Sequence, residues 1–303
     1  MSLNKVVRSY LCAASSLTLC GAMSVLATQP AMGQELYGSE TGMVREVREF
    51  RVRLPFENAA RAVTTEVVDN VVVYEGDIVL GTVEELQRDN PFTTSPKVGG
   101  GAHTRGVIID GSRYRWASSV IPYSIPSNHP QRARIEAAIQ MVQDTTNLCM
   151  VPRTTQSDYV NFVNGSGCSS YVGRRGGGQS ITIGSCSTGS IAHEIFHAAG
   201  LFHEQSREDR NNFITVHLEN VEAGKEHNFD RHVSDATDYS TYNYGSIMHY
   251  GATAFSKNGL PTIVVKTQPG SATPTIGQRN APSSGDVRAI NSIYSVNSSA
   301  ACR

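Results

Sequence analysis

The residues best suited to chemistry lie in one short stretch, HEIFHAAGLFH, which covers residues 193–203. On a helix, His193 and His197 lie one turn apart on the same face, so both imidazoles can bind one cation at about 2.0–2.1 Å. Glu194 points to the side of that cation, where its carboxylate can hold a metal-bound water and take its proton. This spacing predicts a metal site that activates water.

Gly200 follows the two histidines at the position where a helix can turn sharply, because glycine tolerates a positive φ. The reversal brings His203 towards the same cation as a third ligand. Three neutral nitrogen ligands leave a fourth position for water, which is typical of a catalytic rather than a structural zinc site. Two histidines at this spacing also occur on ordinary buried helices, but the complete eleven-residue pattern favours zinc.

A second feature, GSIMHYG, follows at residues 245–251. A methionine among small residues in a tight turn, such as Met248, is by itself most consistent with core packing. Downstream of a long zinc motif it has a more specific interpretation, since metzincin proteases place a methionine turn beneath the metal.

The zinc motif continues as EQSREDR, residues 204–210, and the methionine turn ends in Tyr250. Together these residues resemble the astacin family of zinc metalloendopeptidases. The chain as a whole resembles a secreted, bacterial-like zymogen of that family. The resemblance runs from Arg115 to Cys302. It implies an α+β, zincin-like metzincin fold with two subdomains on either side of a cleft. One would hold a twisted, mostly β-sheet and two long helices, including the active-site helix; the other would be largely irregular, with a final helix.

The resemblance also implies roles for individual residues. His193, His197 and His203 would bind one catalytic zinc ion, and Glu194 would be the general base. Tyr250 would be an additional, displaceable zinc ligand whose phenol hydrogen-bonds the developing oxyanion.

Three further residues receive roles by the same comparison. Met248 would form the hydrophobic floor of the site. Glu204 would be buried and would connect the site to the matured N-terminus. In YEGDI, residues 74–78, Asp77 would block the zinc of the zymogen, although Gly-Asp is also common in ordinary turns.

The N-terminal third of the chain differs in character from the part that carries these motifs. Residues 1–33 resemble an export signal, with Lys5 and Arg8 before an uncharged apolar stretch and cleavage expected after Ala27 or Gly33. A membrane anchor and a lipoprotein attached through Cys20 are weaker alternatives. Residues 34–105 are charged and end in a Gly-rich linker, which is compatible with a small N-terminal domain or with a pro-segment removed near Arg105. The resemblance favours the pro-segment, and residues 106–303 would then form the catalytic domain.

Export favours disulfides between the cysteines that remain, Cys149, Cys168, Cys186 and Cys302, for which three pairings are possible. Cys168 and Cys186 enclose a short Gly-rich segment, so they are natural partners. Cys149 and Cys302 would then close a long loop. The resemblance implies the same two pairs.

Hydrophobic periodicity predicts the elements around the motifs. Pro122 suggests that its strand is an edge strand or irregular. We expect strands at 120–125, 159–163 and 180–184, helices at 131–146, 190–199 and 285–296, and a loop at 266–285.

The chain carries 26 Lys and Arg against 27 Asp and Glu, which argues against a nucleic-acid binder that neutralises many phosphates. We therefore expect protein or peptide substrates, inhibition by the chain's own pro-segment, no nucleic acid, no stable membrane insertion, a monomer and secretion. Two other classes of function stay open. One is a zinc hydrolase acting on a cell-wall peptide or a small ester, and the other is a binding module that has lost turnover.

Overall fold

A computed structural model describes residues 46–52, 61–88, 107–232, 236–238, 241–267, 270–296 and 302. Every described residue belongs to one compact unit, Gly33–Arg303. The expected export signal, the Gly-rich linker and the expected cleavage site near Arg105 lie outside the described residues.

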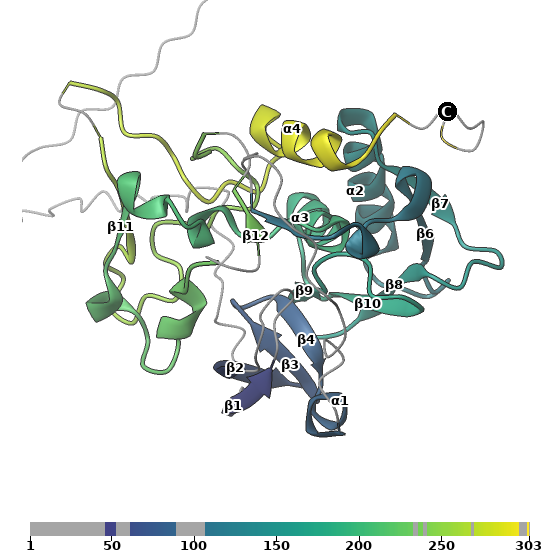
Figure 1. The fold of residues 1–303 in the computed structure, drawn as a ribbon, viewed down its shortest axis with the longest axis horizontal. Coiled ribbons are helices and arrows are strands. Elements are labelled where there is room, and N and C mark those ends of the chain that lie inside the picture. The colour runs from purple at the N-terminus through teal and green to yellow at the C-terminus, as the bar shows by residue number, and fades with distance from the viewer. Residues whose placement is uncertain are drawn as a thin grey trace, which may run out of the picture. The chain divides into compact units, whose positions relative to one another are not determined.

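A mixed sheet of nine strands runs through the described residues, in the order β1-β2-β3-β4-β9-β10-β8-β6-β7 (Figure 1). In chain order its strands are β1 (Glu46–Val52), β2 (Arg61–Val68), β3 (Val71–Tyr74), β4 (Ile78–Thr82), β6 (Val120–Ser124), β7 (Cys149–Pro152), β8 (Tyr159–Asn164), β9 (Cys168–Ser170) and β10 (Gly178–Ile183).

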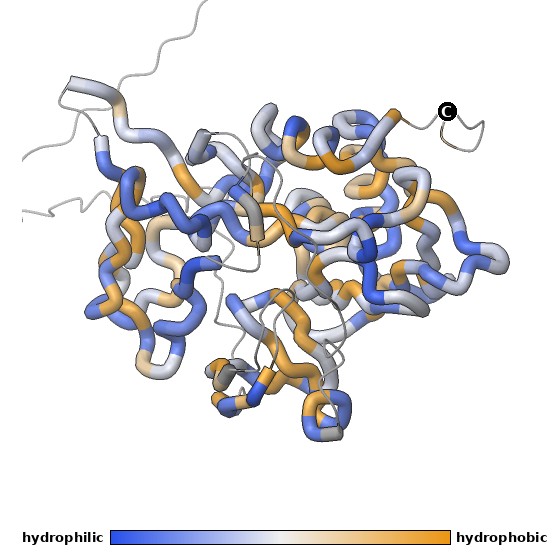
Figure 2. The backbone as a smooth tube through the Cα atoms, in the orientation of Figure 1, coloured by the Kyte–Doolittle hydropathy of each residue, from blue (hydrophilic) through white to orange (hydrophobic). Residues whose placement is uncertain are grey.

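The N-terminal segment, defined as residues 46–88, contributes β1–β4 and the short helix α1 (Val83–Arg88). Its strands pair in antiparallel order, and β4 then pairs in parallel with β9 through Ile78 and Ser170. Most apolar residues of β3 and β4 (Figure 2) are buried in a cluster that they share with Val107, Ile109 and Phe202, so this segment packs against the later part of the chain. No strands or helices were predicted for this segment from the sequence.

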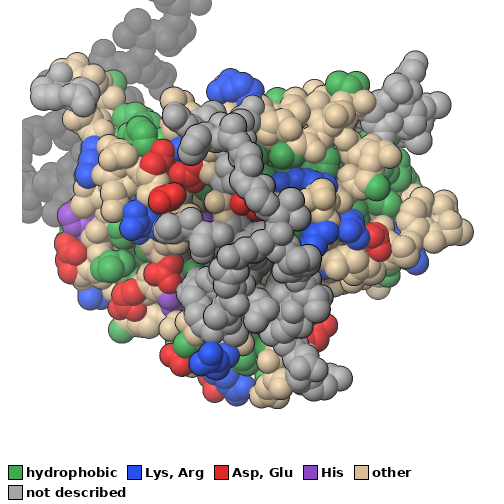
Figure 3. Space-filling view, viewed as in Figure 1, with side chains coloured by type: hydrophobic (Ala, Val, Ile, Leu, Met, Phe, Trp, Pro, Cys, Tyr) green, Lys and Arg blue, Asp and Glu red, His purple; other side chains and the backbone are tan. Residues whose placement is uncertain are grey.

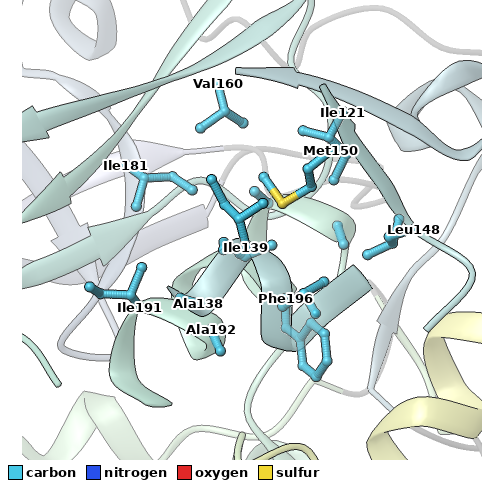
Figure 4. Packing of buried hydrophobic residues seen from close by; sticks show 14 of the residues in the cluster. Ile121, Ala138, Ile139, Leu148, Met150, Val160, Ile181, Ile191, Ala192 and Phe196 are labelled. Carbon is cyan, nitrogen blue, oxygen red and sulfur yellow. The ribbon is translucent and has the colours of Figure 1, made fainter. Parts of the chain in front are cut away.

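Two helices, α2 (Arg132–Thr145) and α3 (Thr188–Ala199), pack together in the main core. Figure 4 shows Ile139 of α2 between the sheet residues Val160, Ile181 and Met150 and the α3 residues. The apolar spacing on α2 places one face against the sheet and leaves charged residues exposed on the other. The expected helices at 131–146, 190–199 and 285–296 are present as α2, α3 and α4 (Ser284–Ile293). The expected α+β fold class is confirmed.

The stretch between α3 and α4 is largely irregular, as expected. Its short strands take part in two small sheets, β11 with β13, and β12 with β5, which lies before β6 in the chain. The other described residues of the stretch form turns, irregular segments and short 3-10 helices. The strands are β5 (Ile108–Ile109), β11 (Ile214–Val216), β12 (Ala236–Thr237) and β13 (Ile263–Val265); the 3-10 helices of the described chain are Ser112–Tyr114, Ala117–Ser119, Glu204–Ser206, Arg210–Asn212, Leu218–Asn220 and Glu226–Phe229.

Pro122 is not in an edge strand, so the first of the two alternatives predicted for its strand was wrong. Its strand β6 lies between β7 and β8. The pairing of β6 with β8 starts only at Tyr123, so the missing N–H of Pro122 falls before that pairing begins.

The structure contains disulfides Cys149–Cys302 and Cys168–Cys186, the two pairs expected from the sequence. The first closes a sequence separation of 153 residues and the second one of 18. Acidic and basic side chains occur near one another on the face in Figure 3, in keeping with the near-neutral charge.

Candidate metal centre

The helix α3 carries two of the predicted ligands, and both of its ends are capped. The Ser187 hydroxyl accepts a hydrogen bond from the backbone N–H of Ser190 at 3.0 Å, which is an N-cap. Gly200 ends the helix in the left-handed conformation with φ 111°, as predicted from its position. The Trp116 indole and the Tyr294 hydroxyl donate to the last carbonyls of α3, each at 2.8 Å. The helix is therefore fixed at the end that carries the histidines.

The chain reverses after Gly200 and brings His203 back to the helix. The turn is held by hydrogen bonds from Leu201 N to Phe196 O at 3.0 Å and from Phe202 N to Val107 O at 2.7 Å. The third predicted ligand thus reaches the first two through the backbone geometry that glycine permits.

Three imidazoles and one carboxylate converge at this point. Candidate ligand atoms of Asp77, His193, His197 and His203 all lie within 4.8 Å of one another, and all four side chains are buried. The Asp77 carboxylate lies 3.2 Å from His193 Nε2, 3.5 Å from His197 Nε2 and 3.1 Å from His203 Nε2. Residues 116 positions apart in the sequence therefore meet at one centre.

The outer nitrogens of the imidazoles fix which way the rings face. His193 Nδ1 donates to the carbonyl of Ile247 at 2.8 Å, and His197 Nδ1 donates to the carbonyl of Leu201 at 2.7 Å. His203 Nδ1 donates to the Glu75 carboxylate at 2.9 Å. Each Nε2 is consequently left with its lone pair directed at the centre, as metal binding requires.

The four donor side chains fit a bound metal ion. Within the described part of the chain, neither Asp77 Oδ1 nor His197 Nε2 makes a hydrogen bond, although both atoms are buried. Buried polar atoms normally have partners. Three imidazoles and one carboxylate match the donors and the number of ligands of a tetrahedral zinc ion. The residues therefore fit the expected cofactor, one zinc ion.

Charges at the centre support the same interpretation. Burial lowers the pKa of His193 well below its usual value, and it also lowers the pKa of His197, so both rings favour the neutral form that binds metals. Burial would lower the pKa of His203 too, but Asp77 and Glu75 raise it. Burial would raise the pKa of the Asp77 carboxyl, but the charge of His203 and the close approach of the three imidazoles hold it well below its usual value.

The other predicted site residues lie next to this group. Glu194 is buried on α3 beside His193 and is not part of the converging set. The Tyr250 ring centroid lies 4.6 Å from that of His203, and its hydroxyl donates to the carbonyl of Glu75 at 2.5 Å. Met248 is buried in the main core, in keeping with a packing role.

Glu204 is buried, as expected, and burial raises its pKa to about 8. Its carboxylate accepts a hydrogen bond from Asn243 N at 2.7 Å and lies 3.5 Å from the Arg207 guanidinium. A matured N-terminus is not among the described residues, so the expected connection of Glu204 stays a prediction.

Pattern reasoning missed two buried residues at the centre, Glu75 and His232. Glu75 contacts His203, Ser206 and His232. Burial would raise the pKa of the Glu75 carboxyl, but the charge of His232 and the hydrogen bonds from His203 and His232 bring it to about 2. The available signal was the position of Glu75, two residues before Asp77 in a motif already noted.

The family model for Astacin, a family of peptidases, matches residues 109–295, which include the three histidines and the methionine turn. The chain belongs to the astacin family. The match excludes residues 46–88, so the segment that supplies Asp77 and Glu75 lies outside the family model.

Astacin relatives resemble most of this chain. Zinc metalloproteinase nas-13 of Caenorhabditis elegans is 36% identical over 245 residues, covering 78% of this chain and 53% of the relative. Blastula protease 10 of Paracentrotus lividus is 38% identical over 234 residues, covering 73% of this chain and 38% of the relative. The chain thus spans about half or less of the length of these two relatives.

A solved structure covers the same region. High choriolytic enzyme 1, a hatching enzyme zinc-protease from Oryzias latipes, is 33% identical with a TM-score of 0.54. The similarity covers 66% of this chain and 98% of that one. The astacin fold expected from the sequence is confirmed.

Proposed function

We propose that this chain is a zinc endopeptidase that cleaves internal peptide bonds of proteins and is made as a secreted zymogen. The observation that carries the proposal is the convergence of three imidazole nitrogens on the Asp77 carboxylate, within a chain of the astacin family. Relatives named as zinc metalloproteinases and proteases support the reaction class.

The proposal divides the chain into a signal at residues 1–33, a pro-segment at 34–105 and a catalytic domain at 106–303. The supporting observation is that β1–β4 lie before the family match and deliver a carboxylate to the histidines of that match. The export-type N-terminus supports secretion, and among the described residues no helix is long and apolar enough to cross a membrane. All proposed site residues come from one chain, which supports a monomer.

The mechanism assigns separate tasks to the metal and the side chains. Zinc, when bound by the three histidines, lowers the pKa of a water molecule and polarises the scissile carbonyl. Glu194 takes the proton of the attacking water and delivers it to the leaving amine. The Tyr250 hydroxyl donates to the oxyanion that develops on the substrate.

Latency follows from the same contacts. In the unprocessed chain, Asp77 occupies the place that water and substrate need, and the Tyr250 hydroxyl is bound to the carbonyl of Glu75. Removal of the pro-segment frees both positions in one step. Asp77 and Tyr250 are thus proposed to be the two points at which the zymogen is silenced.

Digestion of casein by the secreted, processed protein tests the proposal. We expect cleavage at internal bonds, its loss with 1,10-phenanthroline, and its recovery on adding zinc. Glu194→Ala should lower kcat by about 10²–10⁴-fold without loss of bound zinc. Full proteolysis by Glu194→Ala would refute the assigned mechanism.

The same preparation distinguishes the alternatives. A small-ester hydrolase would cleave an ester but leave casein intact, and a binding module would cleave neither. Mass spectrometry of the active form gives its N-terminus; an N-terminus upstream of Asp77 in a fully active enzyme would refute the zymogen proposal.

A further inference from the structure

Glu75 occupies a position that is unfavourable for a glutamate. It lies in the turn between β3 and β4 with φ 49°, a conformation that side chains rarely adopt, and its side chain is fully buried. Burying a carboxylate also costs free energy unless it is paired and hydrogen-bonded. Such a residue calls for specific compensating contacts.

The compensating contacts all come from the catalytic side of the proposed boundary. One carboxylate oxygen of Glu75 accepts from His203 Nδ1 at 2.9 Å. The other accepts from the Ser206 hydroxyl at 2.9 Å and lies 2.9 Å from His232 Nε2. A single pro-segment side chain therefore joins three groups of the catalytic domain.

His232 is positioned as a seat for this carboxylate. It is buried, its backbone N–H donates to the carbonyl of Ser206 at 2.7 Å, and its ring lies 4.1 Å from the Phe202 ring. The Tyr74 ring covers its edge at 6.2 Å. The ring is thus held between the two parts of the chain, with one nitrogen directed at Glu75.

The three metal-binding histidines differ in where their outer partners come from. His193 and His197 donate to backbone carbonyls of the catalytic domain, which remain after processing. Of the three outer Nδ1 atoms, only that of His203 donates to a group of the pro-segment, the Glu75 carboxylate. An outer carboxylate fixes the tautomer and orientation of a metal-bound histidine and makes it a stronger ligand.

We propose that Glu75 is a second acidic anchor of the pro-segment. It positions His203 through the outer nitrogen of that ring, while Asp77 blocks the metal-binding side of the centre. His232 and Ser206 form its seat. Glu75 is a positioning residue and does not touch the metal. This inference rests on the proposed function, since it assumes that the pro-segment is removed on activation.

One consequence is that processing changes the metal centre as well as uncovering it. His203 loses its carboxylate partner together with the pro-segment, whereas the outer partners of His193 and His197 persist. The zymogen therefore holds zinc more tightly than the processed enzyme does, beyond the contribution of Asp77.

The test uses the full chain carrying Glu194→Ala, so that no self-processing occurs, loaded with zinc. The rate of zinc transfer to excess 1,10-phenanthroline is measured, together with hydrogen exchange of amides 71–82. Glu75→Gln keeps the size of the side chain but removes its charge. Glu49→Gln, an exposed glutamate of β1, is the matched control.

We expect Glu75→Gln to speed zinc transfer by roughly 10–100-fold, the usual effect of losing an outer partner, and Glu49→Gln to leave it unchanged. His232→Gln should also speed transfer. The double variant of Glu75 and His232 should be no faster than Glu75→Gln alone, because His232 acts through Glu75.

A further variant, Val72→Ala, separates positioning from general loosening. Val72 is fully buried in β3, so its truncation weakens the segment without removing the carboxylate. If the two variants show the same hydrogen exchange of amides 71–82, Glu75→Gln should still release zinc faster than Val72→Ala does. Equal zinc release by the two variants would mean a merely structural role and would overturn the inference.

Asp77→Asn, measured in parallel, separates the two proposals. One outcome is that Asp77→Asn transfers zinc fast while Glu75→Gln transfers it at a rate within about twofold of the parent. That outcome refutes the second anchor and leaves the zymogen proposal standing. Unchanged rates in both variants refute the blocked centre itself.

Discussion

Asp77 meets the three imidazoles although it lies 116 residues before the first of them, so the centre is built from two distant parts of the chain. At the residue scale, the histidines could be predicted because helical spacing and a glycine turn determine where they point. Asp77 could be predicted only through resemblance, since Gly-Asp is common in turns. His232 could not be predicted, and Glu75 only from its position two residues before Asp77, because the burial of both depends on how the two parts pack.

Tyr250→Phe tests the oxyanion role. The hydroxyl is expected to act on the transition state and not on the bound substrate, so its loss should lower kcat by about 10²-fold with little change in KM. Steady-state kinetics of the processed enzyme on an internally quenched peptide give both constants.

Tyr244→Phe is the matched control for this measurement. Its hydroxyl donates to the carbonyl of Phe213 at 3.1 Å, away from the metal centre, so kcat should stay near that of the parent. An unchanged kcat in Tyr250→Phe would contradict the assigned role.

Asp77→Asn tests the zymogen block through activity. An amide is a weaker zinc ligand than a carboxylate, so the unprocessed variant should cleave a peptide that the unprocessed parent does not. Intact mass must establish that both proteins are unprocessed. Asp69→Asn, at an exposed turn of the same segment, should stay latent; equal latency of both variants would count against the block.

At the element scale, α3 is positioned by contacts that leave no space at its first turn. A Cβ at Gly189 would lie 1.7 Å from the backbone oxygen of Arg279, in the loop before α4. The carboxylate of Asp286 in α4 in turn accepts from Ser246 and from the backbone of Ile247 in the methionine turn, at 2.5 and 3.0 Å. The loop before α4 and α4 itself therefore help to position both α3 and the methionine turn.

Gly189→Ala should destabilise the fold by about 1–3 kcal/mol or prevent folding, because a backbone oxygen must move to admit the methyl group. Gly245→Ala is the control, since its nearest neighbour would be a side-chain oxygen at 3.7 Å. Urea unfolding followed by tryptophan fluorescence compares the two free energies of unfolding. Equal values would show that the contact at Gly189 is not restrictive.

The helices and central strands were predictable because apolar residues repeat with the period of each element. Ile135, Ala138, Ile139 and Val142 are all buried, as their spacing requires. The N-terminal segment was harder to read in the same way. The alternating charges of β1 favour exposure. The apolar runs of β3 and β4 fit strands, but nothing in the local pattern states that β4 pairs with β9.

At the scale of the whole molecule, the N-terminal segment extends the sheet formed by the later strands. Its β4 pairs with β9, and its Glu66 forms an ion pair of 2.6 Å with Lys225. Under the zymogen proposal, inhibition uses strand pairing, an ion pair and metal-directed carboxylates at once. The irregular region between α3 and α4 takes part in this contact through Lys225 and His232.

The disulfide between Cys149 and Cys302 ties the C-terminal end to β7. Replacing both cysteines by serine should lower the free energy of unfolding by about 2–5 kcal/mol, with most of the effect on the unfolded chain. The pair Cys168 and Cys186 closes a shorter loop and should cost less on the entropic account. Thermal unfolding under oxidising conditions measures both, and a larger loss for the shorter loop would contradict that account.

Anomalous diffraction at the zinc edge on crystals of the unprocessed, zinc-loaded chain tests the central claim most directly. We predict a single zinc peak among the Nε2 atoms of His193, His197 and His203, with a carboxylate oxygen of Asp77 at about 2.0–2.2 Å from it. A zinc peak away from these histidines, or water in place of the Asp77 carboxylate, would contradict the account.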